Sequence, residues 1–148
     1  MINIRHVGIY VDNIEQMTSF YKTVFQMIAV CERQKDANDL LDELLGYKNT
    51  IIITTKLITP TGKMRGEGDM IELVKVLSGP DSRILSLPVY HVGTMHIAIG
   101  VENIREIMSL IIENGGCKKT EIVTHQNGNK FAFATDPEGN WLELIERN

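Results

Sequence analysis

The chain has 148 residues, of which 43% are hydrophobic and 23% are charged, a composition typical of one ordered globular domain with its own core. Its formal net charge of -4 offers no basic surface for a polyanion, so we expect no nucleic-acid partner. No apolar run approaches the roughly 20 residues that span a bilayer, and the two cysteines, Cys31 and Cys117, lie far apart in the sequence; we therefore expect a cytoplasmic protein without a membrane partner, with both thiols reduced and buried.

A strand followed by a helix is predicted at the start of the chain. Apolar residues alternate with other types over residues 6–11, which is the period of a β-strand, and the less apolar face opens with His6. Asn13 follows, with Gln16 three residues on, the pattern of a helix N-cap and its partner. The helix that begins here carries an apolar stripe at helical spacing: Met17, Phe20, Tyr21 and Val24.

Three further strands are predicted in the first half, at residues 29–34, 50–58 and 70–76. Two insertions lie between them. Residues 38–46 contain four leucines and predict a short amphipathic helix that ends at Gly46, whereas residues 60–68 predict a charged, glycine-rich loop. Each insertion is either a lid over a substrate or a surface loop without a function, and the sequence leaves both interpretations open.

The second half repeats the order of the first after a linker at about residues 78–93. His96 opens a strand over residues 96–101, and Asn103 with Glu106 repeats the N-cap pattern. The apolar stripe of the helix that follows is Ile104, Ile107, Met108 and Ile111, and Gly115-Gly116 ends it. Strands are predicted at 120–124, 130–135 and 141–146. The order strand, helix, three strands therefore occurs twice.

Two glutamates lie within apolar strands at equivalent places in the two halves. Glu72 is embedded in G-D-M-I-E-L-V and Glu143 in G-N-W-L-E-L-I. The strand period puts each glutamate on the face opposite its two aliphatic neighbours. An ionised carboxylate buried without a partner costs several kcal/mol. These two carboxylates therefore need a cation, unless the duplicated fold has kept them only for hydrogen bonds.

The two histidines at equivalent places complete a duplicated set of two imidazoles and two carboxylates. Because clusters of His and Glu mark metal sites, the predicted ligands are His6, Glu72, His96 and Glu143. Such a set suits one divalent ion, namely Zn, Ni, Co, Mn or Fe(II), with positions left for water or for two neighbouring substrate oxygens. His91 and His125 have no duplicated counterpart and are interpreted as surface residues.

A substrate anion would need a fixed positive donor. The candidates are Arg5, Arg33, Lys56, Arg65 and Lys130, each of which could equally be a solvated surface charge. Trp141 lies on the same predicted strand face as Glu143 and is interpreted either as a wall of the site or as a core or interface residue.

These paired units resemble the vicinal oxygen chelate superfamily, the group of glyoxalases, bleomycin resistance proteins and extradiol dioxygenases. The resemblance rests on the two His-led strands, on the two glutamate strands, and on the segment F-A-T-D-P-E-G-N-W-L-E-L-I-E that ends at Glu146. It implies an α+β fold in which two tandem βαβββ units form a U-shaped, mixed-sheet cup around a metal held by the four residues above. One domain would span residues 1–148, with unit 1 at about 1–77, the linker at about 78–93 and unit 2 at about 94–148.

The activity that the resemblance implies is that of a metal-dependent lyase or isomerase of glyoxalase type, acting on a small carbonyl or thioester substrate. Glu143 or Glu72 would move a proton between adjacent carbons. Three alternatives stay open: a racemase similar to methylmalonyl-CoA epimerase, suggested by residues 71–82 and their G-x-D-S run, an extradiol-type dioxygenase, and a non-catalytic binding protein walled by Tyr10, Trp141 and residues 40–45. A homodimer is also expected, with the site within one chain or shared between two.

Overall fold

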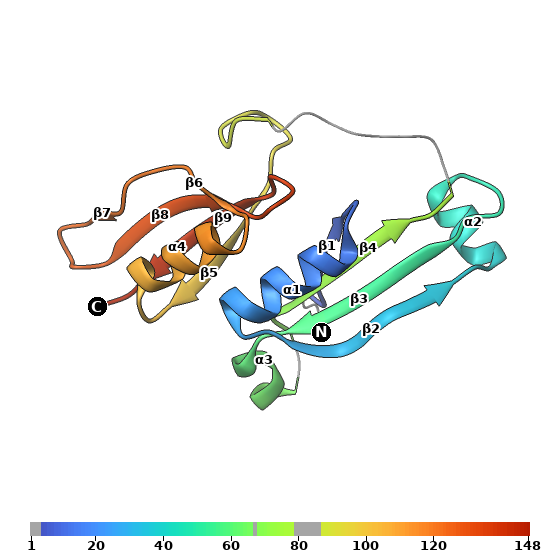
Figure 1. The fold of residues 1–148 in the computed structure, drawn as a ribbon, viewed down its shortest axis with the longest axis horizontal. Helices are drawn as coiled ribbons and strands as arrows, with labels where there is room; N and C mark the ends of the chain where they lie inside the picture. The colour runs from blue at the N-terminus through green and yellow to red at the C-terminus, as the bar shows by residue number, and fades with distance from the viewer. Residues whose placement is uncertain (1–3, 67, 79–86) are drawn as a thin grey trace. The chain divides into compact units, whose positions relative to one another are not determined.

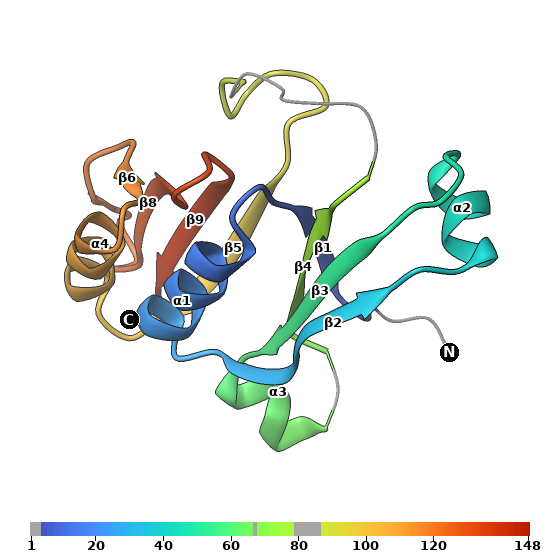
Figure 2. The same ribbon diagram turned by 45° about the vertical axis from the view of Figure 1, so that its right-hand side comes forward.

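The computed structural model describes residues 4–66, 68–78 and 87–148. The chain divides into two compact units, Met1–Ser82 and Arg83–Asn148, each built around its own mixed sheet (Figure 1). Within each unit one long helix lies against one face of the sheet (Figure 2). Both units follow the order strand, helix and further strands, so the predicted α+β fold of two βαβββ modules is confirmed.

Unit 1 contains a four-stranded sheet in the order β1-β4-β3-β2. Its elements are β1 (Val7–Tyr10), α1 (Ile14–Phe25), β2 (Ile28–Asp36), α2 (Asp39–Leu45), β3 (Ile52–Ile58), α3 (Pro60–Arg65) and β4 (Met70–Val76). Strand β1 runs parallel to β4, and the β2–β3 and β3–β4 pairs are antiparallel. The central position of β4 next to β1 brings two distant stretches of sequence side by side.

Unit 2 repeats this arrangement with the order β5-β9-β8-β6, and β7 also pairs with β8. Its elements are β5 (His96–Val101), α4 (Ile104–Glu113), β6 (Cys117–Lys118), β7 (Val123–Thr124), β8 (Lys130–Thr135) and β9 (Trp141–Glu146). Strand β5 runs parallel to β9, as β1 does to β4. Glu72 pairs in register with Gly8 and Glu143 with Ala98, so each glutamate lies opposite the residue two positions after the histidine of its unit.

The faces of the two central strands are divided as the alternation predicts. Leu73 in β4 and Leu142 and Leu144 in β9 have no exposed surface, because they point toward the helix that covers their sheet. The apolar stripe of α1 is buried as predicted, and in α4 Ile104, Met108 and Ile111 are buried while Ile107 is half-buried. Glu72 and Glu143 therefore lie on the faces that α1 and α4 do not cover.

Both long helices begin at the predicted caps. The side chain of Asn13 accepts a hydrogen bond from the backbone N–H of Gln16 at 3.0 Å, and Asn103 accepts one from Glu106 at 3.2 Å. Glu146 adds a second cap to α4, since its carboxylate accepts from the backbone N–H of Ile104 at 2.8 Å. This hydrogen bond, together with the ion pair to Lys130, holds the pKa of Glu146 below its usual range.

Two predicted segments differ from the structure. Residues 60–68 are not an irregular loop, because Pro60–Arg65 forms α3, capped by the Thr59 side chain and ended by Gly66 at φ +80°. A proline at the first helical position followed by a glycine stop is a helix signal that the charge of this segment concealed. Glu67 in this insertion lies outside the described residues.

The strand predicted at residues 120–124 is wrong in its extent. The backbone N–H groups of Lys119 and Thr120 both donate to the carbonyl of Phe133, at 3.0 and 3.2 Å, and the Thr120 hydroxyl accepts from the Phe133 N–H at 2.9 Å. This bulge interrupts pairing with β8 and leaves two short strands, β6 and β7, in place of one.

The cysteines are also less buried than predicted. Cys117 is exposed and Cys31 is half-buried, and both are free thiols. Each lies on a strand at the end of its sheet, β6 or β2, where only one neighbouring strand covers it. His91 and His125 are exposed, as predicted.

Part of the predicted linker, residues 79–86, lies outside the described residues, and with it the G-x-D-S run. Residues 87–93 form turns, in which the backbone N–H of His91 donates to the carbonyl of Pro88 at 3.0 Å. Across the described ranges, the helices are all too short or too polar to cross a membrane.

The predicted helix in the first insertion is confirmed as α2, which Asn38 caps and Gly46 ends. Its attachment to β3 is polar. The Asp42 carboxylate accepts from the backbone N–H groups of Thr50 at 2.7 Å and Asn49 at 2.8 Å. These hydrogen bonds hold the pKa of Asp42 below its usual range. Asp42 therefore ties α2 to the segment that leads into β3.

We expect the anchoring of α2 to be lost in acid. Because the pKa of Asp42 is lower in the folded chain, its contribution to stability is present above about pH 4, the usual carboxyl range, and is lost as the pH falls through the folded pKa. Asp42→Asn should abolish this dependence and raise amide hydrogen exchange in α2 already at neutral pH. Hydrogen exchange measured against pH tests this, with Glu43→Gln on the same helix as the control; equal exchange in the two variants would contradict the assignment.

Candidate functional site

The histidine and the glutamate of unit 1 are in contact. His6 lies directly before β1 and Glu72 lies on the parallel neighbour β4, and the His6 Nε2 and Glu72 Oε2 atoms are 3.0 Å apart. The Glu72 side chain is 18% exposed and that of His6 is 37% exposed, so the pair lies at a partly open surface rather than in the core. The parallel register of β1 and β4 is what brings these two residues together.

Unit 2 repeats the same contact. His96 begins β5 and Glu143 lies on β9, with His96 Nε2 and Glu143 Oε2 3.2 Å apart. The Glu143 side chain is 24% exposed. The predicted duplication therefore holds in three dimensions within each unit, where one imidazole nitrogen and one carboxylate oxygen face each other across parallel strands.

The spacing within each pair fits two ligands of one metal ion. Donor atoms bound at about 2.1 Å and at right angles to each other lie about 3 Å apart, which is close to the separations in both units. Imidazole nitrogen and carboxylate oxygen are also the donors that borderline divalent ions take. Neither unit supplies more than this pair: in the described ranges, no three His, Cys, Asp or Glu side chains gather closely enough to hold a metal.

The two pairs differ in the residue beside the glutamate. Lys56 on β3 is in register with Glu72, and its ammonium lies 3.1 Å from Glu72 Oε1. Phe133 on β8 is in register with Glu143, and its ring packs edge-on against His96 with centroids 5.5 Å apart. The equivalent position is thus a cation in unit 1 and an aromatic ring in unit 2, and the glutamate of unit 1 has a second charged partner.

Trp141 extends the aromatic surface of unit 2. Its ring packs edge-on against Phe133 at 6.1 Å, and the Lys119 ammonium lies 5.7 Å from its centroid. The indole N–H donates to the carbonyl of Leu87 at 2.8 Å. Trp141 is half-buried, and it lies in register with His96 on the neighbouring strand.

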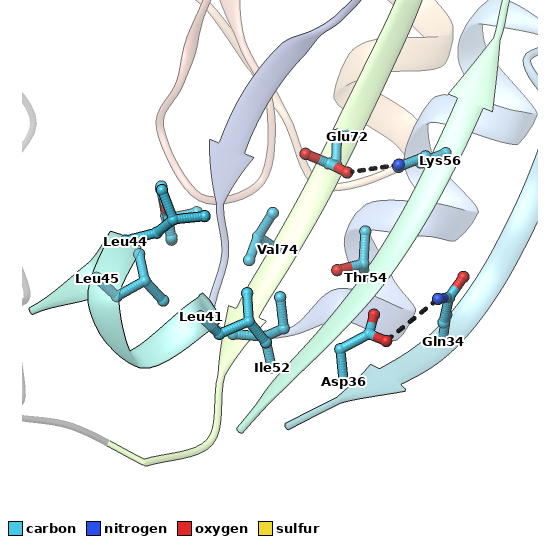
Figure 3. A pocket seen from close by; sticks show the side chains of 11 residues that line it. Gln34, Asp36, Leu41, Leu44, Leu45, Ile52, Thr54, Lys56, Glu72 and Val74 are labelled. Atoms are coloured by element: carbon cyan, nitrogen blue, oxygen red, sulfur yellow. Dashed lines mark hydrogen bonds and ion pairs between the residues drawn. The ribbon is translucent and has the colours of Figure 1, made fainter. Parts of the chain in front are cut away.

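A cavity of about 380 Å³ lies on the Glu72 face of the unit 1 sheet, beneath α2 (Figure 3). The Glu72–Lys56 ion pair lies at one end, and leucines of α2 project over the other. The lining residues are Tyr10, Gln34, Asp36, Leu41, Leu44, Leu45, Ile52, Thr54, Lys56, Glu72 and Val74. The first insertion thus contributes to a cavity that contains one of the predicted ligands, whereas α3 does not line it.

The five basic residues that were candidates for binding a substrate anion differ in their surroundings. Arg33 forms an ion pair with Glu15, Arg65 with Asp69 at 3.9 Å, and Lys130 with Glu146. Arg5 is exposed. Only Lys56 among the five lines the described cavity.

Phe133 and Lys119 were not among the site residues predicted from the sequence, and Lys56 was not predicted to pair with Glu72. Lys56 and Phe133 occupy equivalent positions beside the two glutamates. This equivalence becomes visible only when the antiparallel registers of β3 with β4 and of β8 with β9 are known. The register follows from how the chain turns between the strands, and in unit 1 that turn contains α3.

These modules place the chain in the class of proteins built from paired βαβββ units. The chain belongs to the Glyoxalase/Bleomycin resistance protein/Dioxygenase superfamily, whose family model matches residues 3–144. This is the group that the sequence motifs resemble. No curated protein matches the chain.

Solved structures share the fold across nearly the whole chain. A glyoxalase family protein from Bacillus cereus has a TM-score of 0.88 at 20% identity, covering 99% of this chain and 94% of its own. The trypanothione-dependent glyoxalase I of Leishmania major has a TM-score of 0.62 at 19% identity, covering 99% and 87%. The fosfomycin resistance protein FosX of Listeria monocytogenes, in complex with Mn(II) and sulfate, has a TM-score of 0.59 at 15% identity, covering 100% and 95%.

Proposed function

We propose that this protein binds one divalent metal ion through His6, Glu72, His96 and Glu143, and that it is a metal-dependent lyase or isomerase of glyoxalase type. The observation that carries the proposal is the duplicated His–Glu contact, with donor atoms 3.0 and 3.2 Å apart in the two units. One pair alone offers too few ligands for a stable protein site. The proposal therefore requires both pairs, from one chain or from two chains of a homodimer.

Relatives of the same fold support metal binding and glyoxalase chemistry as the starting point. One of them is described in complex with Mn(II), and another is a glyoxalase I. The donor set of this chain suits Zn, Ni, Co, Mn or Fe(II). The expected substrate is a small molecule with neighbouring oxygens. The cytoplasmic location of the protein stays a prediction.

A divalent ion at this site would polarise neighbouring oxygens of a carbonyl substrate and acidify the adjacent C–H bond. Without the ion, Glu72 contacts both His6 and Lys56, and in the described part of the chain His96 is the one charged partner of Glu143. With the ion bound, Glu143 or Glu72 would move the proton between adjacent carbons while the other glutamate stays a ligand.

A second candidate function is favoured by the cavity beneath α2. Its walls combine the leucines of α2, Ile52 and Val74 with several polar and charged side chains, and a non-catalytic binding protein would need such a cavity without a metal. An epimerase acting on methylmalonyl-CoA and an extradiol-type dioxygenase use the same fold with different substrates. Metal content separates the binding protein from the three enzymes.

We expect the purified protein to retain about one divalent ion per four-residue ligand set and to lose all catalytic activity on treatment with a chelator. Elemental analysis after native gel filtration measures the metal. A screen with a hemithioacetal, methylmalonyl-CoA and a catechol then separates the three chemistries, with activity on the hemithioacetal as the expected result. A metal-free protein that cannot be loaded and that converts none of these substrates would overturn the proposal and leave the binding protein.

A further inference from the structure

Helix α2 holds apolar side chains at the surface without burying any of them. Its residues include Leu40, Leu41, Leu44 and Leu45, and none is fully buried. Leu44 is 71% exposed and yet lines the cavity. What fixes α2 is polar: the Asn38 and Gly46 caps, and the hydrogen bonds of Asp42. Leu44 is therefore exposed at the cavity, and Leu41 and Leu45 are only half-buried there, so this helix leaves apolar surface available to a ligand.

Lys56 lines the other end of the cavity. Lys56 pairs with Glu72 at 3.1 Å. The other carboxylate in the cavity lining, Asp36, accepts a hydrogen bond from Gln34 at 3.3 Å and lies away from that pair (Figure 3). The two positive charges of a divalent ion match the two negative charges of Glu72 and Glu143. With the ion bound, the Lys56 ammonium would lose its counter-charge and become a cation facing the cavity.

We propose that the cavity beneath α2 binds a small carboxylate with an apolar chain. The carboxylate pairs with Lys56, beside Glu72, and the chain lies against Leu41, Leu44 and Leu45. A volume of about 380 Å³ lies at the small end of ligand pockets, which span roughly 300–1,000 Å³. This inference rests on the proposed metal site, because the ion is what releases Lys56 from Glu72, and it names the substrate class for that site.

Calorimetric titration of the full-length protein loaded with Mn(II) tests the inference, with loading first established by electron paramagnetic resonance. Octanoate carries both features of the ligand, acetate only the head group, and octanol only the chain. We expect octanoate to bind about tenfold or more tightly than either of the others, since a charge-assisted contact and apolar burial act together. Octanoate should bind more weakly to the chelator-treated protein, where Lys56 stays paired with Glu72.

Two matched pairs of variants separate the head group from the chain. Lys56→Met should remove the preference for octanoate over octanol, whereas Lys35→Met, at an exposed lysine that does not line the cavity, should not. Leu44→Ser should weaken octanoate about tenfold and leave acetate unchanged. Leu40→Ser, on the same helix and 63% exposed but outside the cavity lining, should change neither.

The outcomes distinguish this inference from the proposed function. A protein that binds Mn(II) but prefers octanol, or keeps its preference in Lys56→Met, overturns the carboxylate site and leaves the metal site intact. A protein that binds no Mn(II) overturns both. Equal octanoate binding with and without Mn(II) contradicts the release of Lys56 and overturns the proposal. If octanoate does not bind and Leu44→Ser changes the oligomeric state, α2 is covered by a second copy of the chain instead.

Discussion

Replacing Glu143 with glutamine should lower the affinity for a divalent metal by about 100-fold or more, because it removes one of four ligands and one of the two negative charges that match the ion. Losing a residue that merely orients a ligand already costs 10–100-fold in metal affinity. His6→Ala, Glu72→Gln and His96→Ala should each have an effect of the same order. Calorimetry with Zn(II) or Mn(II) on each purified variant measures it.

The chain offers controls of the same residue types. His125 is exposed, and the Glu121 side chain is 86% exposed in an ion pair with Lys118. His125→Ala and Glu121→Gln should therefore bind metal like the unmodified chain, and circular dichroism should show all variants folded. Metal affinity unchanged in both His6→Ala and Glu143→Gln would contradict the four-ligand site.

Leu73→Ala should lower the free energy of unfolding by about 2–5 kcal/mol, the range for truncating a fully buried leucine. Leu73 lies next to Glu72 on β4 and has no exposed surface, because it points to the opposite face from Glu72. Urea denaturation followed by circular dichroism measures the change.

Val76 on the same strand is 39% exposed and provides the comparison. Val76→Ala should change the free energy of unfolding by less than about 1 kcal/mol, since little apolar area is lost from the interior. Equal destabilisation by the two variants would mean that β4 is not divided into a core face and a ligand face, and the position assigned to Glu72 would then be wrong.

Local sequence patterns predicted most of the fold, where one physical rule decides the structure. Alternation placed Leu142 and Leu144 on one face of β9 and Glu143 on the other, and Asn13 and Asn103 marked the starts of both long helices. These features depend on neighbours within a few residues. The strand predicted at 120–124 failed because a distant partner decides, since hydrogen bonds to Phe133 interrupt the pairing at Thr120. Helix α3 was missed although its signals, Pro60 and Gly66, are local.

The candidate site was predictable to the same extent. Duplication identified the four residues, and the parallel registers then showed that they form one His–Glu pair in each unit. The neighbours that distinguish the pairs, Lys56 and Phe133, could be identified only from the antiparallel registers. That difference gives unit 1 a cation and unit 2 an aromatic ring beside otherwise equivalent His–Glu pairs.

X-ray absorption spectroscopy of the Zn(II)-loaded protein tests the metal site most directly, since it counts the atoms bound to the ion. We expect a first shell of nitrogen and oxygen at about 2.0–2.2 Å with two imidazoles per ion and no sulfur. A shell that contains a thiolate from Cys31 or Cys117, or a single imidazole, would contradict it.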